Sequence, residues 1–214
     1  MDLVIRGCQV LENGSFTSAE LLIRGGKLME IGPHVSDSGL PVLTFEQAVV
    51  LPGLVDVHVH LREPGFSYKA TVASETRAAA RGGFTALCAM PNLDPVPDSA
   101  AHLEEELALL RRDAAVTVRP YGAITVGERG QALADLEAMA PYVAGFSDDG
   151  KGVQAPEMMR AAMVRAKALD KLIVAHCEDE SLLRGGYIHD GTYAKAHGHR
   201  GICSESEWGP IARD

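Results

Sequence analysis

The sequence DVHVHLREPG at residues 56–65 places two histidines, His58 and His60, two positions apart at the end of an apolar run. The run before them, AVVLPGLVDV at residues 48–57, has the composition of a buried strand that follows a Pro-Gly turn. Residues i and i+2 of a strand point to the same face, so both imidazoles can reach a single point. This arrangement suits a metal ion, because two imidazoles in an apolar core would each need a separate hydrogen-bond partner.

From Leu51 onward, short apolar runs alternate with helical patterns. Strands are predicted at VDVHVH (55–60), FTALCAM (84–90), VTVRPYGAI (116–124), VAGFSDD (143–149) and KLIVAHC (171–177). Such alternation indicates a parallel sheet. The first fifty residues differ, because LVIRGCQVL, ELLIRGGKLMEIG and PVLTFEQAVVL are β-rich runs broken by turn residues. They predict hairpin-linked strands of a small separate sheet.

Polar residues with metal-binding or anion-binding chemistry gather where the predicted strands end. They are His58, His60, Asn92, Asp148, Asp149 and His176. Ligand sites of open α/β sheets and of TIM barrels lie at this carboxyl edge. Three imidazoles and a carboxylate suit zinc, and more than four such ligands would allow two metal ions. The alternative for the acidic pair is a loop that caps the next helix.

Two further residues are candidates for binding an anionic substrate. Arg62 lies two residues past His60, and its guanidinium can hold a carboxylate through two parallel hydrogen bonds. The alternative for Arg62 is a surface ion pair with Glu63. Asn92 ends the second predicted strand and can donate to an anionic oxygen, although an asparagine before a turn is often only a turn residue.

The composition of the chain restricts the classes of partner. The 214 residues carry a net charge of −9, with 46% hydrophobic and 23% charged residues, so no basic stripe is available for nucleic acid. No apolar segment approaches the roughly 20 residues that span a bilayer. The N-terminal sequence MDLVIRGCQV lacks the pattern of a secretory signal, and the four cysteines lie far apart. These features predict reduced thiols and a cytoplasmic protein.

The stretches PGLVDVHVHLREPG, ARGGFTALCAMPN, FSDDGKGVQ and IVAHCED, in this order and spacing, closely resemble the dihydroorotases of the amidohydrolase superfamily. The resemblance is to the bacterial, longer-chain type, with an aspartate in place of a carboxylated lysine between the metals. It implies a (β/α)8 TIM-type barrel, with about five of its eight strands in residues 51–214, and a small N-terminal β-sandwich domain in residues 1–50. The chain is therefore expected to be the N-terminal portion of such an enzyme.

The resemblance also implies roles for the candidate residues. It implies two Zn²⁺ ions per complete active site. His58 and His60 would hold one ion, His176 would help to hold the other, and Asp149 would bridge them, with Asp148 as the alternative. The implied substrate contacts are His60, Arg62 and Asn92. The catalytic aspartate of the family is expected outside this portion of the barrel.

The activity implied by the resemblance is the interconversion of N-carbamoyl-L-aspartate and L-dihydroorotate in pyrimidine (UMP) biosynthesis. One alternative is a hydantoinase, dihydropyrimidinase or allantoinase, which use a lysine where FSDDG stands here, and Lys151 lies close by in the sequence. The other alternative is an inactive scaffold subunit that binds aspartate transcarbamoylase. A homodimer is also compatible with the resemblance.

Overall fold

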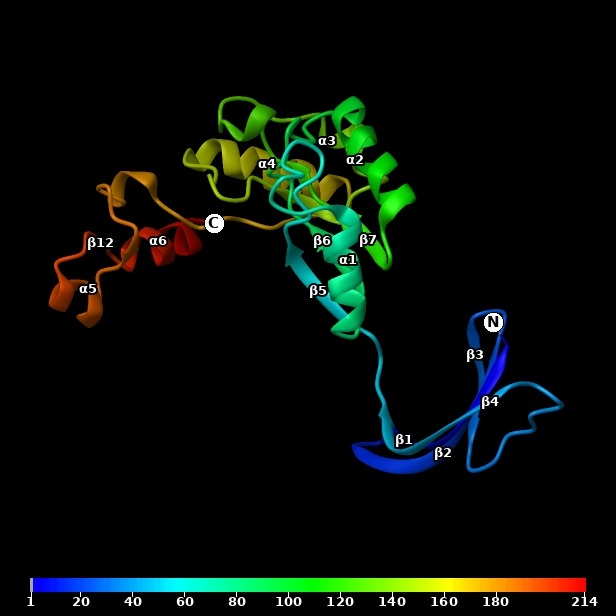
Figure 1. Cartoon of the computed structure of the whole chain (residues 1–214). Coiled ribbons are helices and arrows are strands. Elements are labelled where there is room, and N and C mark those ends of the chain that lie inside the picture. Colours follow the sequence, from blue (N-terminus) through cyan, green and yellow to red (C-terminus); the bar gives the residue numbers. More distant parts are fainter. Residues whose placement is uncertain (1) are drawn as a thin grey trace. The chain divides into compact units, whose positions relative to one another are not determined.

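The computed structural model describes residues 2–214, apart from the side chain of Gln47. The chain forms two compact units, of which the first ends at Gly53 and the second spans Leu54–Asp214 (Figure 1). Among the described residues, none of the helices combines the length and the apolar character needed to cross a bilayer.

The first unit is a single four-stranded sheet. Its strands are β1 (Leu3–Glu12), β2 (Ser15–Arg24), β3 (Lys27–Gly32) and β4 (Val42–Val50), in the order β3-β2-β1-β4. The β1-β2 and β2-β3 pairs are antiparallel hairpins, as predicted, whereas β4 runs parallel to β1 and is therefore not a hairpin partner. A sandwich needs two packed sheets, whereas the described residues of this unit form a single sheet.

The second unit contains the predicted parallel strands. They are β5 (Leu54–Val59), β6 (Phe84–Ala89), β7 (Thr117–Pro120), β8 (Gly122–Ala123), β9 (Gly145–Ser147) and β10 (Leu172–Ile173). Two parallel ladders result, β5-β6-β7 and β8-β9-β10. The alternation of strands and helices that the sequence predicts is thus confirmed.

Two predicted strands differ in length from the observed ones. The run at 116–124 is divided at Tyr121, because its first part pairs with β6 and its second part with β9. Pro120 ends the first part, and proline has no N–H to continue a ladder. The run at 171–177 forms a strand only at Leu172–Ile173, so His176 lies in the segment after the strand.

Helices occupy the segments between the strands and continue after β10. They are α1 (Val72–Arg81), α2 (Ala100–Asp113), α3 (Leu136–Met139), α4 (Pro156–Ala168), α5 (Thr192–His197) and α6 (Glu205–Arg213). Short 3₁₀ helices cover Val126–Glu128 and Glu180–Leu182, and β11 (Ile188–His189) pairs with β12 (Gly201–Ile202). Ser99 is the N-cap of α2, and its hydroxyl oxygen accepts a hydrogen bond from the His102 N–H.

The main core of the second unit lies where α3 and α4 meet β9, around the buried side chains of Leu136, Met139, Phe146 and Met159. β5, by contrast, is not the buried strand that its apolar run predicts, since Val55 and Val57 are exposed. β5 lies at the end of its ladder, and the described residues leave the face that carries Val55 and Val57 uncovered.

The N-terminus of α1 is closed by a capping box. The Thr71 hydroxyl accepts from the Ser74 N–H and the Ser74 hydroxyl accepts from the Thr71 N–H, both at 3.1 Å. We expect Thr71→Ala to lower the free energy of unfolding by about 1 kcal/mol, because one helix donor loses its partner. Urea unfolding followed by circular dichroism measures this change. Thr71→Ser keeps the acceptor and should match the wild type, so an equal loss in both variants would contradict the prediction.

Candidate metal centre

His58 and His60 face the same carboxylate from the end of β5. His58 belongs to the strand and His60 follows it directly. The Nε2 atom of His58 lies 3.5 Å from Asp149 Oδ1, and that of His60 lies 3.6 Å from Asp149 Oδ2. The two-residue spacing in a strand therefore brings both imidazoles to one point, as β geometry requires.

His176 approaches the same carboxylate from the segment after β10. Its Nδ1 atom lies 3.6 Å from Asp149 Oδ1, and its Nε2 atom lies 3.6 Å from Glu178 Oε2. One donor atom each from His58, His60 and Asp149 all lie within 4.8 Å of one another. Two imidazoles from the end of β5 and one from the segment after β10 thus lie around the Asp149 carboxylate, which follows β9.

The spacing of these atoms fits a metal centre better than a hydrogen-bond network. The nitrogen–oxygen distances of 3.5–3.6 Å are longer than ordinary hydrogen bonds. Two ligands that each lie about 2.0–2.2 Å from a tetrahedral zinc are about 3.3–3.5 Å apart. Imidazole nitrogens and a carboxylate are also the donor types that zinc prefers.

The electrostatics of the cluster keep Asp149 ionised. Its contact with His176 is the main cause that lowers the pKa of Asp149, and the charges of His58 and His60 act in the same direction, while burial opposes them. The same contact raises the pKa of His176. A carboxylate that stays charged at neutral pH is ready to ligate a cation.

Asn92 connects His60 to Asp149. Its Nδ2 atom donates to Asp149 Oδ2 at 3.1 Å, and its Oδ1 atom lies 3.0 Å from His60 Nδ1. A carboxylate accepts hydrogen bonds only, so the amide must turn its oxygen toward His60, and His60 Nδ1 must donate. The lone pair of His60 is then on Nε2, the atom that faces Asp149. Asn92 is thus part of the cluster and not only a turn residue.

The structure separates the two acids of the SDDG sequence. Asp148 is buried and turned away from the histidines, and its carboxylate accepts from the backbone N–H groups of Ile124 and Thr125 at 2.7 and 3.1 Å. Burial raises the pKa of Asp148, and these hydrogen bonds oppose the rise. Of the two acids, Asp149 is the one whose carboxylate faces the three imidazoles.

Arg62 lies just beyond His60, in the left-handed region with φ of 67°, and is half-buried. The Glu63 carboxylate accepts from the Val72 N–H at the start of α1, at 2.8 Å. Within residues 2–214 the ion pairs do not include one between Arg62 and Glu63, so the alternative interpretation of Arg62 is wrong.

The sequence did not point to Glu128, which lies near the acidic pair. It is buried, its Oε1 atom has no partner among the described residues, and its Oε2 atom is 3.8 Å from Lys151 Nζ. Burial, followed by the charge of Asp148, raises the pKa of Glu128 to about 7. Nothing in the surrounding VGERG sequence distinguishes this glutamate from an exposed loop residue.

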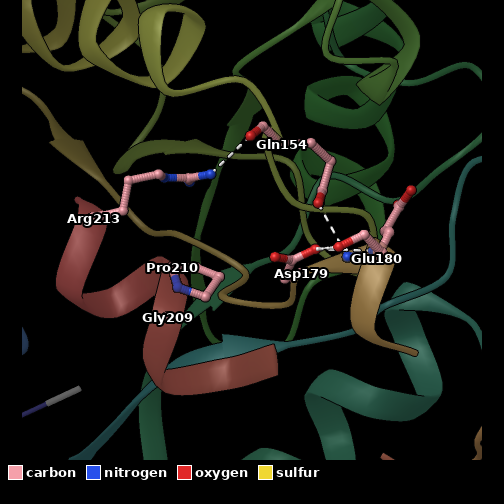
Figure 2. Close-up of a pocket in the computed structure, with 7 residues that line it drawn as sticks. Gln154, Asp179, Glu180, Gly209, Pro210 and Arg213 are labelled. Carbon is pink, nitrogen blue, oxygen red and sulfur yellow. Dashed lines mark hydrogen bonds between the residues drawn. The ribbon is translucent and has the colours of Figure 1, made fainter. Parts of the chain in front are cut away.

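A separate hollow of about 500 Å³ lies between α6 and the segments after β9 and β10 (Figure 2). Figure 2 shows Gln154 between Arg213 and Glu180, where Gln154 Oε1 accepts from the Glu180 N–H at 3.1 Å. The Arg213 guanidinium donates to the carbonyl oxygens of Val153 and Gln154, each at 2.9 Å. These polar groups hold α6 in place, and the hollow contains none of the three clustered imidazoles.

Comparisons with known proteins identify relatives over nearly the whole chain. Residues 47–214 match the profile of the family described as dihydro-orotase-like. The chain is 44% identical over 212 residues to a dihydroorotase of Fusobacterium nucleatum subsp. nucleatum, covering 99% of this chain and 50% of that protein. It is 46% identical over 204 residues to a dihydroorotase of Bacillus cytotoxicus, covering 95% and 48%. The chain thus spans about half the length of the dihydroorotases that it matches.

Solved structures share the fold at lower identity. An L-hydantoinase (dihydropyrimidinase) from Arthrobacter aurescens aligns with a TM-score of 0.77 and 20% identity, covering 99% of this chain and 49% of that one. A D-hydantoinase aligns with a TM-score of 0.73 and 19% identity, covering 100% and 48%. These likenesses concern the course of the backbone and carry no statement about substrate.

Proposed function

The chain belongs to the dihydro-orotase-like family, and on that premise we propose that it carries part of the active site of a zinc-dependent dihydroorotase. The reaction would be the interconversion of N-carbamoyl-L-aspartate and L-dihydroorotate in pyrimidine (UMP) biosynthesis. The observation that carries this proposal is the set of three imidazoles around the Asp149 carboxylate, at the carboxyl ends of strands from the two parallel ladders. Active sites of α/β barrels lie at these ends of the strands.

We propose that the cluster holds two Zn²⁺ ions in the complete site. His58 and His60 would ligate one ion, His176 would help to ligate the other, and Asp149 would lie between them. Bound zinc would supply a Lewis acid that polarises the amide carbonyl and activates water near neutral pH. Asn92 would hold His60 in the tautomer that leaves Nε2 free for a ligand bond.

The substrate carboxylate would be bound by Arg62 and Asn92, with His60 nearby. The Arg62 guanidinium offers a planar pair of donors that match a carboxylate. Asn92 has two amide hydrogens on Nδ2, and its hydrogen bond to Asp149 uses one of them. The second hydrogen can therefore donate to a substrate oxygen without loss of the first contact.

Two observations favour this activity over the alternatives. Lys151, the lysine nearest to the acidic pair in sequence, has its ammonium 3.8 Å from Glu128, so it is paired with another carboxylate. This arrangement supports an aspartate between the metals and argues against the hydantoinase-type alternative. The ordered cluster around Asp149 argues against an inactive scaffold, because a scaffold has no need of convergent metal ligands.

The remaining parts of the proposal concern the whole protein. Residues 1–50 would form a small domain of the β-sandwich type and residues 51–214 the first part of a (β/α)8 barrel. A cytoplasmic location is supported by the four cysteines, all of which are free thiols. A homodimer is the assembly that this proposal includes, whereas aspartate transcarbamoylase is the partner of the scaffold alternative.

L-dihydroorotate and dihydrouracil provide a direct test, because they differ by the ring carboxylate alone. We expect the zinc-loaded protein to bind L-dihydroorotate at least about tenfold more tightly, since a hydrogen bond to a charged group contributes roughly 1.5–3 kcal/mol. Arg62→Met should remove most of this preference. Isothermal titration calorimetry measures both affinities. Equal binding of the two ligands by the wild type would contradict the proposed substrate and favour the dihydropyrimidinase alternative.

A further inference from the structure

The buried acid Asp148 has no role in the chemistry proposed above, yet both of its carboxylate oxygens accept hydrogen bonds. It is 1% exposed, and its Oδ1 atom accepts from the N–H groups of Ile124 and Thr125. Its Oδ2 atom accepts from the Thr125 hydroxyl. All three donors belong to the two residues that directly follow β8, so one segment binds both oxygens of the carboxylate.

Thr125 is fixed in turn by its own neighbours. It is completely buried, and its hydroxyl oxygen accepts from the Gly130 N–H at 2.9 Å. Its carbonyl oxygen accepts from the Glu128 N–H at 3.0 Å. Because the Gly130 N–H can only donate, the single hydroxyl proton of Thr125 must point to Asp148. The hydroxyl is therefore a fixed donor and not a free rotor.

Asp148 and Asp149 are neighbours in the chain with carboxylates turned to different partners. Asp148 faces Thr125, and Asp149 faces His58 and His60. A rotation of the backbone at Asp148 would carry the Asp149 carboxylate away from the imidazoles. The Gly152 N–H donates to the Asp148 carbonyl at 2.9 Å and closes the turn that contains both acids.

We propose that Thr125 and Asp148 are positioning residues that hold this turn so that Asp149 faces the metal site. The inference rests on the proposed metal centre and extends it to residues that do not touch the metal. Metal ligation tolerates little displacement, and groups that orient a ligand typically change metal affinity about 10–100-fold when they are removed. If the Asp148 carboxylate loses this buried donor, it can rotate toward another donor and displace the turn that carries Asp149.

The test is the zinc affinity of matched threonine variants of the full chain, measured by competition with a chromophoric chelator. Thr125→Val keeps the shape but removes the hydroxyl, and we expect it to weaken zinc binding by about 10–100-fold. Thr125→Ser keeps the hydroxyl and should bind within about threefold of the wild type. Thr76→Val is the control, because Thr76 in α1 is equally buried and its hydroxyl also makes two hydrogen bonds. It donates to the Val72 carbonyl and accepts from the Ala115 N–H.

The outcomes separate this inference from the proposed function. Wild-type zinc affinity in Thr125→Val would overturn the positioning role and leave the proposed metal centre unaffected. An equal loss of zinc affinity in Thr76→Val would also overturn the positioning role, because it would indicate a general loosening of the fold. A wild-type chain that binds no zinc would overturn the metal centre itself. If Thr125→Val fails to fold, Asp148→Asn replaces it, because the amide keeps the shape but lacks the charge. That variant should also bind about tenfold more weakly, and unchanged affinity would overturn the proposal.

Discussion

Asp149→Asn is expected to weaken zinc binding at least about 100-fold, which is more than the loss of an outer group that only orients a ligand. The reason is that Asp149 supplies the one carboxylate that all three imidazoles approach within 3.6 Å. An amide has the same shape but no charge, and its nitrogen cannot ligate as a carboxylate oxygen does. Without the carboxylate, the positive charge of the metal would face three neutral imidazoles.

The measurement is a competition titration with a chelator, combined with the zinc content of the purified protein by atomic emission. Asp135→Asn is the matched control, because Asp135 is exposed and caps α3 through the Ala138 N–H at 3.2 Å. We expect this control to bind zinc as the wild type does. Retention of zinc within about threefold by Asp149→Asn would show that the carboxylate is not a ligand.

The strand pattern explains how far the sequence could predict the cluster. The spacing of His58 and His60 determines their common face, because β geometry has a period of two. The parallel alternation places the ends of β5 and β9 at one edge, so a carboxylate of the SDDG sequence was expected near the histidines. His176 was expected at the end of a longer strand, but it approaches from a segment beyond β10 and still reaches Asp149.

Other features depend on contacts that no local pattern encodes. Periodicity shows that Asp148 and Asp149 lie on opposite sides, but it does not say which side holds Thr125, which is 23 residues earlier than Asp148. The division of one predicted strand at Tyr121 depends on its having different neighbours along its length. The exposure of Val55 and Val57 in β5 depends on what packs over that face, and an apolar run alone cannot distinguish a covered strand from an uncovered one.

Glu106→Met is expected to stabilise the protein, because Glu106 is a buried acid without a partner. It lies on the buried side of α2 with Leu103 and Leu110, is 1% exposed, and neither carboxyl oxygen has a hydrogen-bond partner among the described residues. A buried polar group without a partner costs roughly 1–3 kcal/mol. Methionine has a similar length and helix propensity, so it removes this cost without opening a large cavity.

The gain should also increase with pH. Burial raises the pKa of Glu106 well above 4.5, so the folded protein retains the proton at pH values where the unfolded chain has released it. The wild type therefore loses stability as the pH rises above 4.5, by up to about 1.4 kcal/mol per unit, until the folded-state pKa is passed. Urea unfolding at about pH 5 and pH 8 measures this difference, with Glu105→Met on the exposed side of the same helix as the control. An equal increase in the free energy of unfolding of Glu106→Met at both pH values would contradict this prediction. It would mean that the Glu106 carboxyl binds water or another group in solution, because only an unsolvated acid makes the stability fall with pH in this way.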